Sequence, residues 1–81
     1  MKAKVIVTLK KEVSDPQGLA VTQSLESLQF KGIKGVRVGK FFEVELEGLT
    51  KEEAEKQIDA AGETILSNPT IETYKFEIVE D

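Results

Sequence analysis

The sequence predicts one α+β domain with two layers, an antiparallel or mixed sheet and two helices packed on one of its faces. Three observations predict this fold. The chain has 81 residues, which is the usual size of a single domain. Three of its segments alternate apolar and polar residues as strands do, and two segments with helical spacing lie between them. The expected order over residues 1–81 is therefore β-α-β-α-β.

The first strand and the first helix are expected before residue 30. Apolar and polar residues alternate over Lys2–Lys10, which predicts a strand with one buried face. Asp15 can cap a helix whose first turn contains Pro16. Apolar residues at helical spacing continue this helix to about Leu28, and we expect Gly32 to stop it.

The middle strand, Ile33–Glu47, is too long for a compact domain of this size. At about 3.3 Å per residue it would extend roughly 50 Å, whereas a compact chain of this length has a diameter of roughly 30 Å. The strand must therefore bend, or overhang the sheet and pair with another chain. If Gly39 breaks it into two strands, the order becomes the ferredoxin-like β-α-β-β-α-β.

The second helix and the last strand follow from residue 50 onward. Thr50 and Glu53 form a capping box at the helix start, and Asn68 and Pro69 are expected to end the helix. The residues expected to form its buried stripe are Ala54, Ile58, Ala61 and Ile65. A last strand is predicted over Thr70–Val79, because its aromatic and aliphatic residues alternate with polar ones.

The composition leaves little room for catalysis. With no cysteine and no histidine, the chain lacks a disulfide, a thiol nucleophile, a histidine-dependent triad and the commonest metal ligand. Neither of the two glycine-rich phosphate-binding patterns occurs. Glu43, Glu45 and Glu47 share one strand face, for which a solvated surface is the preferred interpretation over a cation site or a basic partner. We therefore expect no catalytic residue and no metal site.

Charge and hydropathy limit the partners of the chain. Residues 1–42 carry a net charge of +5 and residues 43–81 a net charge of −9, and we expect these halves to interleave in space. With a pI of about 4.9 and one arginine, the chain is not expected to bind nucleic acid. No apolar run is long enough to span a bilayer and no signal-peptide core follows Met1, so we expect a cytoplasmic protein without a membrane partner.

Three motifs occur in an order that resembles a known family. They are Asp15-Pro16-Gln17-Gly18, then Val36-Arg37-Val38-Gly39-Lys40, then Leu66-Ser67-Asn68-Pro69-Thr70-Ile71-Glu72-Thr73-Tyr74. Together they resemble PurS, the small subunit of phosphoribosylformylglycinamidine synthase, over essentially the whole chain. The resemblance implies a non-catalytic accessory subunit in de novo purine synthesis, where the complex converts formylglycinamide ribonucleotide to the amidine with ATP and ammonia from glutamine.

The resemblance also implies which partners the chain has. A glutaminase subunit makes the ammonia, and a large synthetase subunit binds ATP, magnesium and the ribonucleotide, so no cofactor is expected in this chain. The small subunit is expected to bridge the two, to form a dimer or tetramer through its long strand, and to help enclose the ammonia path. The family offers no active-site residues to carry over.

Eight residues are therefore predicted to have partner-contact or framework roles. Arg37 and Lys40 flank Gly39 in the long strand, where a backbone could approach an anion or another chain. Gly18 lies in the first turn of a helix, where glycine costs up to about 1 kcal/mol relative to alanine, which favours close packing or a partner contact. The full set is Asp15, Gly18, Arg37, Gly39, Lys40, Asn68, Pro69 and Glu72.

A second function remains open at this point. A small ferredoxin-like domain could sense a metabolite bound at a subunit interface near Gly39. Thermal-shift screening against amino acids and nucleotides would separate the two functions, because a sensor is stabilised by its ligand.

Overall fold

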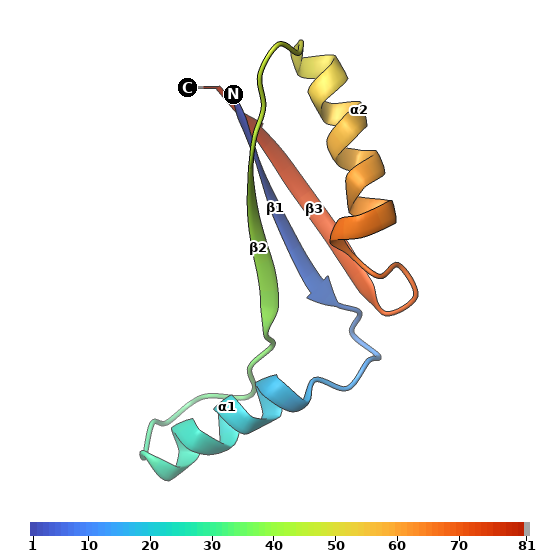
Figure 1. Ribbon diagram of the computed structural model, residues 1–81. Helices are drawn as coiled ribbons and strands as arrows, with labels where there is room; N and C mark the ends of the chain where they lie inside the picture. Colours follow the sequence, from blue (N-terminus) through green and yellow to red (C-terminus); the bar gives the residue numbers. More distant parts are fainter. Residues whose placement is uncertain (81) are drawn as a thin grey trace.

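The computed structural model describes residues 1–80, and it confirms the predicted class and order of elements. The elements are β1 (Lys2–Leu9), α1 (Pro16–Ser27), β2 (Gly39–Glu45), α2 (Lys51–Ala61), the π-helical turn η1 (Gly62–Leu66) and β3 (Glu72–Val79). The strands form an antiparallel sheet in the order β2-β1-β3 (Figure 1). Within residues 1–80, no helix is long and apolar enough to cross a membrane.

The core lies between α2 and one face of the sheet. β1 is the central strand, and its Val5 pairs across to Phe42 on β2 and to Phe76 on β3. The buried apolar side chains of the described residues are Ala3, Val5, Val7, Ala54 and Ile58. Aromatic and aliphatic side chains of β2 and β3 pack around them. This small core holds the sheet and α2 together by removing apolar surface from water.

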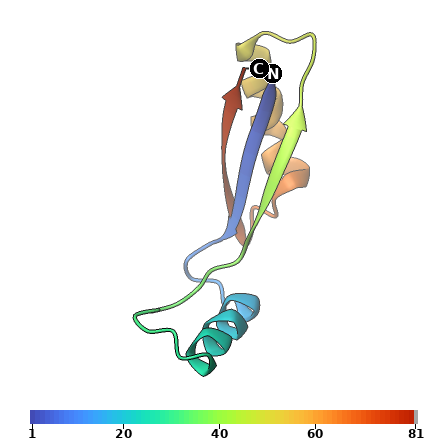
Figure 2. The ribbon, with the colours of Figure 1, turned by 90° about the vertical axis from the view of Figure 1, so that its left-hand side faces the viewer.

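The first helix does not lie where a two-layer arrangement would put it. Figures 1 and 2 show α1 beyond the end of the sheet, at the opposite end from the chain termini, while α2 alone runs along the sheet. The prediction of two helices on one face is therefore wrong for α1. The reason is local, because α1 packs against the extended segment that leads into β2, where the backbone of Val36 touches Gly18.

The middle strand is shorter than predicted. Its hydrogen-bonded part is Gly39–Glu45, not Ile33–Glu47. The ladder stops because Thr8 of β1 pairs with Gly39, and β1 ends one residue later. Residues 33–38 overhang the sheet and have no neighbouring strand in this chain, so Gly39 begins the strand instead of dividing it.

The overhang makes the molecule long. Its extents are 49 × 29 × 15 Å and its Cα radius of gyration is 16.1 Å, whereas a compact chain of this length has a radius of gyration of about 12 Å.

The second helix ends in a π-helical turn that the sequence pattern does not reveal. The turn places one extra residue in the helix, which rotates the following side chains. As a result Ile65, predicted to be buried, is 79% exposed, and Leu66 packs against the core instead. Ser67 closes the turn, since its N–H and its hydroxyl both donate to the carbonyl of Gly62, at 3.1 and 2.6 Å. Asn68, which was expected to end the helix, does not have the positive φ of a left-handed helix cap.

The end of α1 also differs from the prediction. Gln29 has a φ of 68° and takes the left-handed position that follows the helix. Its N–H donates to Glu26, and the N–H of Phe30 donates to the carbonyl of Leu25, which is the Schellman pattern. The helix therefore ends at Ser27, five residues before Gly32, whose own φ of 81° lies at a bend in the following connection.

Candidate functional site

Asp15 ties the start of α1 to the segment that leads into β2. One carboxylate oxygen accepts from the N–H of Gly18 at 2.9 Å, which caps the helix, and the other accepts from the N–H of Val38 at 2.7 Å. These hydrogen bonds, first that from Val38, hold the pKa of Asp15 below its ordinary value, and the nearby charge of Arg37 lowers the pKa further. Asp15 is thus both a helix cap and a cross-link between two chain segments.

Arg37 makes a second cross-link beside the first. Its Nη2 donates to the carbonyl oxygens of Lys10 and Val13, at 2.9 and 3.1 Å. The side chain therefore reaches from the segment before β2 to the connection between β1 and α1. We call the set Asp15, Gly18, Arg37 and Val38 the joint, because its contacts link both connections that run between the sheet and α1.

Two glycines allow backbones to touch at or near the joint. A Cβ at Gly18 would lie 2.1 Å from the carbonyl oxygen of Val36, and one at Gly39 would lie 2.6 Å from the carbonyl oxygen of Val7. Neither position leaves room for a side chain. Gly18 lets α1 cross the extended segment closely, and Gly39 lets β2 begin directly against β1.

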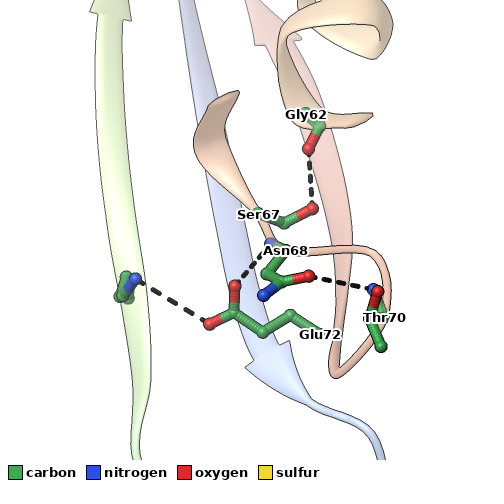
Figure 3. A network of polar contacts seen from close by, with 6 residues as sticks. Gly62, Ser67, Asn68, Thr70 and Glu72 are labelled. Carbon is green, nitrogen blue, oxygen red and sulfur yellow. Dashed lines mark hydrogen bonds and ion pairs between the residues drawn. The ribbon is translucent and has the colours of Figure 1, made fainter. Parts of the chain in front are cut away.

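A second polar cluster joins β3 to the loop after η1 and to β2. One carboxylate oxygen of Glu72 accepts from the N–H of Asn68 at 2.7 Å, and the amide oxygen of Asn68 accepts from the N–H of Thr70 at 3.1 Å (Figure 3). The other oxygen of Glu72 lies 3.8 Å from Nζ of Lys40. That ion pair contributes at most about 1 kcal/mol, because the Lys40 side chain is 62% exposed. Pro69 lies in the exposed loop between these residues.

The eight predicted residues are gathered at one end of the sheet, where β1 ends and β2 and β3 begin. Asp15, Gly39, Lys40 and Glu72 line one hollow of about 160 Å³ there. Small-molecule sites usually measure roughly 300–1,000 Å³. The joint and the Glu72 cluster make contacts within the chain, which are framework roles. Contacts with a partner stay predictions for these residues, and the exposed Lys40 ammonium has the greatest freedom to make one.

On the face of the sheet away from the core, the glutamates of β2 and β3 lie beside lysines of β1. Lys4 of β1 stands between glutamates of β2 and β3, since it pairs across to both Glu43 and Glu77, and Lys2 pairs across to Glu45 on β2. Nζ of Lys2 also donates to the Glu43 carboxylate at 3.3 Å. The two charged halves of the sequence therefore interleave here, as expected. They do not interleave around α1, where the basic residues of the first half remain.

Several apolar side chains in and beside α1 are exposed. Only Gly18 is buried in this helix. Leu28 is 71% exposed, and Leu19, Val21 and the neighbouring Phe30 are exposed as well. Val21, Leu25 and Leu28 lie at helical spacing, yet none of them is buried within the described residues.

One contact between α2 and β3 was not predicted. The hydroxyl of Tyr74 donates to the carbonyl and to the carboxylate of Asp59, at 2.9 and 2.8 Å. The hydrogen bond to the Asp59 carboxylate, followed by desolvation and the negative charge of Asp59, raises the pKa of Tyr74 to about 12. The ring of Tyr74 also lies against Gly62, where a Cβ would approach it within 2.5 Å. The feature of the sequence that could have indicated this contact is Gly62, a glycine in the last turn of the helical segment.

Comparison with known proteins gives a consistent result. Residues 2–80 match the family model PurS, described as phosphoribosylformylglycinamidine (FGAM) synthase. The PurS subunit of Synechocystis is 40% identical over 75 residues, which cover 93% of this chain and 75% of the relative.

Solved structures agree with this family match. The structure of Bacillus subtilis PurS has a TM-score of 0.86 and 37% identity, and the match covers 98% of both chains. Methanocaldococcus jannaschii PurS has a TM-score of 0.82 and 32% identity over 98% of both chains, and is described as a subunit of formylglycinamide ribonucleotide amidotransferase in the purine biosynthetic pathway. The chain therefore belongs to the PurS family of phosphoribosylformylglycinamidine synthase subunits.

Proposed function

We propose that the chain is a non-catalytic assembly subunit that bridges the glutaminase and synthetase subunits of phosphoribosylformylglycinamidine synthase. The observation that carries this proposal is the excess of exposed surface. The chain exposes 6202 Å², whereas a monomeric protein of 9.0 kDa exposes roughly 4,900 Å². An excess of roughly 1,300 Å² per chain is of the size that a partner covers in a stable complex.

The chemistry of the chain supports a role in binding. It has no cysteine or histidine, and the carboxylate of Asp15 and the guanidinium of Arg37 are engaged by the chain's own backbone. We therefore assign ATP, magnesium and glutamine to the partner subunits and no cofactor to this chain. A subunit placed between the source and the consumer of ammonia would lie beside the ammonia path, which the proposal includes.

Self-association belongs to the same proposal. In the order β2-β1-β3 both outer strands have an unpaired edge, and residues 33–38 continue beyond the sheet. Unpaired edges are surfaces onto which further strands can add. We propose a dimer or tetramer in the cytoplasm as the form that meets the two larger subunits. The alternative of a metabolite sensor near Gly39 has no comparable support, because the hollow there is only about 160 Å³.

Reconstitution tests the proposed function. Purified synthetase and glutaminase subunits would be mixed with formylglycinamide ribonucleotide, ATP and glutamine, with and without this chain. We expect glutamine-dependent amidine formation only with the chain. Turnover with an ammonium salt in place of glutamine controls for the synthetase itself. Full glutamine-dependent turnover without the chain would contradict the proposal.

A further inference from the structure

The outer edge of β3 carries backbone groups that have no partner within residues 1–80. β3 pairs with β1 on one side only. The N–H of Lys10 donates to the carbonyl of Ile71, which continues the β1–β3 ladder, and in such a ladder every second residue turns its backbone groups away from the neighbouring strand. The N–H and C=O groups of Tyr74, Phe76 and Ile78 therefore face outward.

This edge has no feature that would keep another strand away. Edge strands are commonly blocked by a bulge, a proline or a covering segment. β3 contains no proline, and its register with β1 runs without a bulge from Glu72 to Val79. An extended segment of another polypeptide can add to such an edge through main-chain hydrogen bonds.

A row of carboxylates lies beside the same edge. Glu55, Asp59 and Glu63 are exposed and follow one another at spacings of four along α2 and η1, so they form one row. The row lies on the β3 side, because the hydroxyl of Tyr74 donates to the carboxylate of Asp59. We call these three residues the carboxylate row.

The carboxylate row is not neutralised by the chain itself. Like charges four residues apart on a helix repel and destabilise it. Within residues 1–80 none of the three carboxylates forms an ion pair with a lysine or an arginine. Cations supplied by a partner would relieve this repulsion.

The spacing of the row fits the side chains of a strand. Carboxylates four residues apart on a helix repeat about every 6 Å along its axis. Side chains on one face of a strand occur at every second residue, which is about 6.6 Å. A strand that carries lysine or arginine at alternate positions can therefore place one cation opposite each carboxylate.

The basic overhang of a second copy does not have this pattern. Lys34 and Arg37 are three residues apart, so in an extended segment they point to opposite faces. The guanidinium of Arg37 and the N–H of Val38 also have acceptors in their own chain. The matching segment must come from a different polypeptide.

We propose that the outer edge of β3 accepts an extended segment of a larger synthase subunit, with lysine or arginine side chains at alternate positions facing the carboxylate row. The inference rests on the proposed assembly role and specifies the surface that performs part of it. Main-chain hydrogen bonds to Tyr74, Phe76 and Ile78 supply affinity, and the three carboxylates set the register of the added strand.

Residue-resolved amide exchange tests the added strand. The chain would be exchanged alone and in the reconstituted complex, then quenched and read by mass spectrometry with electron-transfer fragmentation. In the chain alone, the amides of Tyr74, Phe76 and Ile78 should exchange fast, whereas those of Lys75 and Glu77 should be slow because they face β1. In the complex, we expect the exchange of the three outward amides to slow by at least about tenfold.

Two results of the exchange experiment would overturn the inference. One is fast exchange of the three outward amides in a complex that is active with glutamine. The other is slow exchange of these amides in the chain alone, in parallel with the mass measured by light scattering, since a second copy would then occupy the edge.

Charge reversal of the carboxylate row gives an independent readout. The double substitution Glu55→Lys with Glu63→Lys should raise, by at least about tenfold, the chain concentration that gives half-maximal glutamine-dependent turnover, because like charges then face each other. Asp59 is left in place because it accepts from Tyr74. Far-ultraviolet circular dichroism checks that the variant is folded.

Glu12→Lys with Glu47→Lys is the matched control, because it makes the same change in net charge at exposed residues outside the row. It should shift the half-maximal concentration by less than about threefold. Equal shifts for the two double variants, or no shift for the row variant, would contradict the inference. Failure of the assembly role would instead appear as turnover that does not depend on the unsubstituted chain, so the two failures are distinguishable.

Discussion

The sheet with α2 and the arm formed by residues 10–38 are held in place by different interactions. In the first region, apolar side chains from β1 and α2 are fully buried against one another. In the arm, α1 buries only a glycine, and the hydrogen bonds of Asp15 and Arg37 fix its position. The comparison shows that one region carries its own core, whereas the other is positioned by hydrogen bonds and leaves most of its apolar side chains outside that core.

The largest effect is expected from removing core volume. Ile58 is 3% exposed on α2, so Ile58→Ala should lower the free energy of unfolding by about 2–5 kcal/mol. Ile65→Ala, seven residues later on the exposed side, should change it by less than about 0.5 kcal/mol. Urea denaturation followed by circular dichroism measures both. Equal effects of the two substitutions would mean that α2 is not the helix that packs on the sheet.

A methyl group at the joint should disturb the arm and leave the sheet intact. An alanine in a helix is normally favoured over glycine by up to about 1 kcal/mol, but a Cβ at Gly18 would lie 2.1 Å from the Val36 carbonyl oxygen. Overpacking of this kind costs about 1–3 kcal/mol. We expect Gly18→Ala to increase amide hydrogen exchange in α1 without changing it in β1.

Gly35→Ala is the control for this substitution, because no atom lies within 4 Å of a Cβ at that position. It should leave the exchange of both elements unchanged. A Gly18→Ala chain in which α1 becomes better protected would show that the close approach to Val36 does not hold the arm.

Acid should loosen the arm through Asp15. Because the pKa of Asp15 is lowered in the folded chain, its carboxylate stabilises the joint above the unfolded pKa of about 3.9. That contribution is lost as the pH falls through the lowered folded pKa. Exchange of α1 amides, corrected for the intrinsic rate, should rise in this range before that of β1.

Asp15→Asn is the control for the acid experiment. It removes the titrating group, so the exchange of its α1 amides should no longer depend on pH over that range. The start of α2 should still respond in both proteins, because the pKa of Glu53 in the capping box is also lowered. Simultaneous loss of protection in α1 and β1 would contradict separate stabilisation of the two regions.

The smallest effect concerns the polar contact within the sheet region. The pKa of Tyr74 is raised to about 12, so its hydroxyl supports the contact with Asp59 below pH 10, and this support is lost as the pH rises toward 12. Since the chain has a single tyrosine, phenolate absorbance reports it alone. Asp59→Asn should move the midpoint down toward 10, and a native midpoint near 10 would contradict the contact.

The sequence predicts elements well where the pattern is local. The Asp15 cap, the Thr50–Glu53 capping box and the alternation of β1 all appear as expected. The position of α1 could not be predicted, because it depends on two hydrogen bonds that cross from residue 37 to the connection after β1. The π-helical turn was missed for a similar reason, since its first residue, Gly62, packs against the ring of Tyr74 on another element.

The candidate residues show a similar division. Asp15, Gly18 and Arg37 could be selected from their spacing and chemistry and Glu72 from the family resemblance, and each makes a specific contact within the chain. Their grouping at one end of the sheet depends on the fold and was not visible in the sequence. The exposure of Val21 and Leu28 on α1 was likewise not visible in their helical spacing, because it depends on where the fold places that helix.

Amide exchange of α1 as a function of protein concentration tests the central claim most directly. If a second chain completes the arm, protection of α1 should rise with concentration in parallel with the mass measured by light scattering, while protection of the central strand β1 stays nearly constant. Full protection of α1 at concentrations where the mass is that of a single chain would contradict the account.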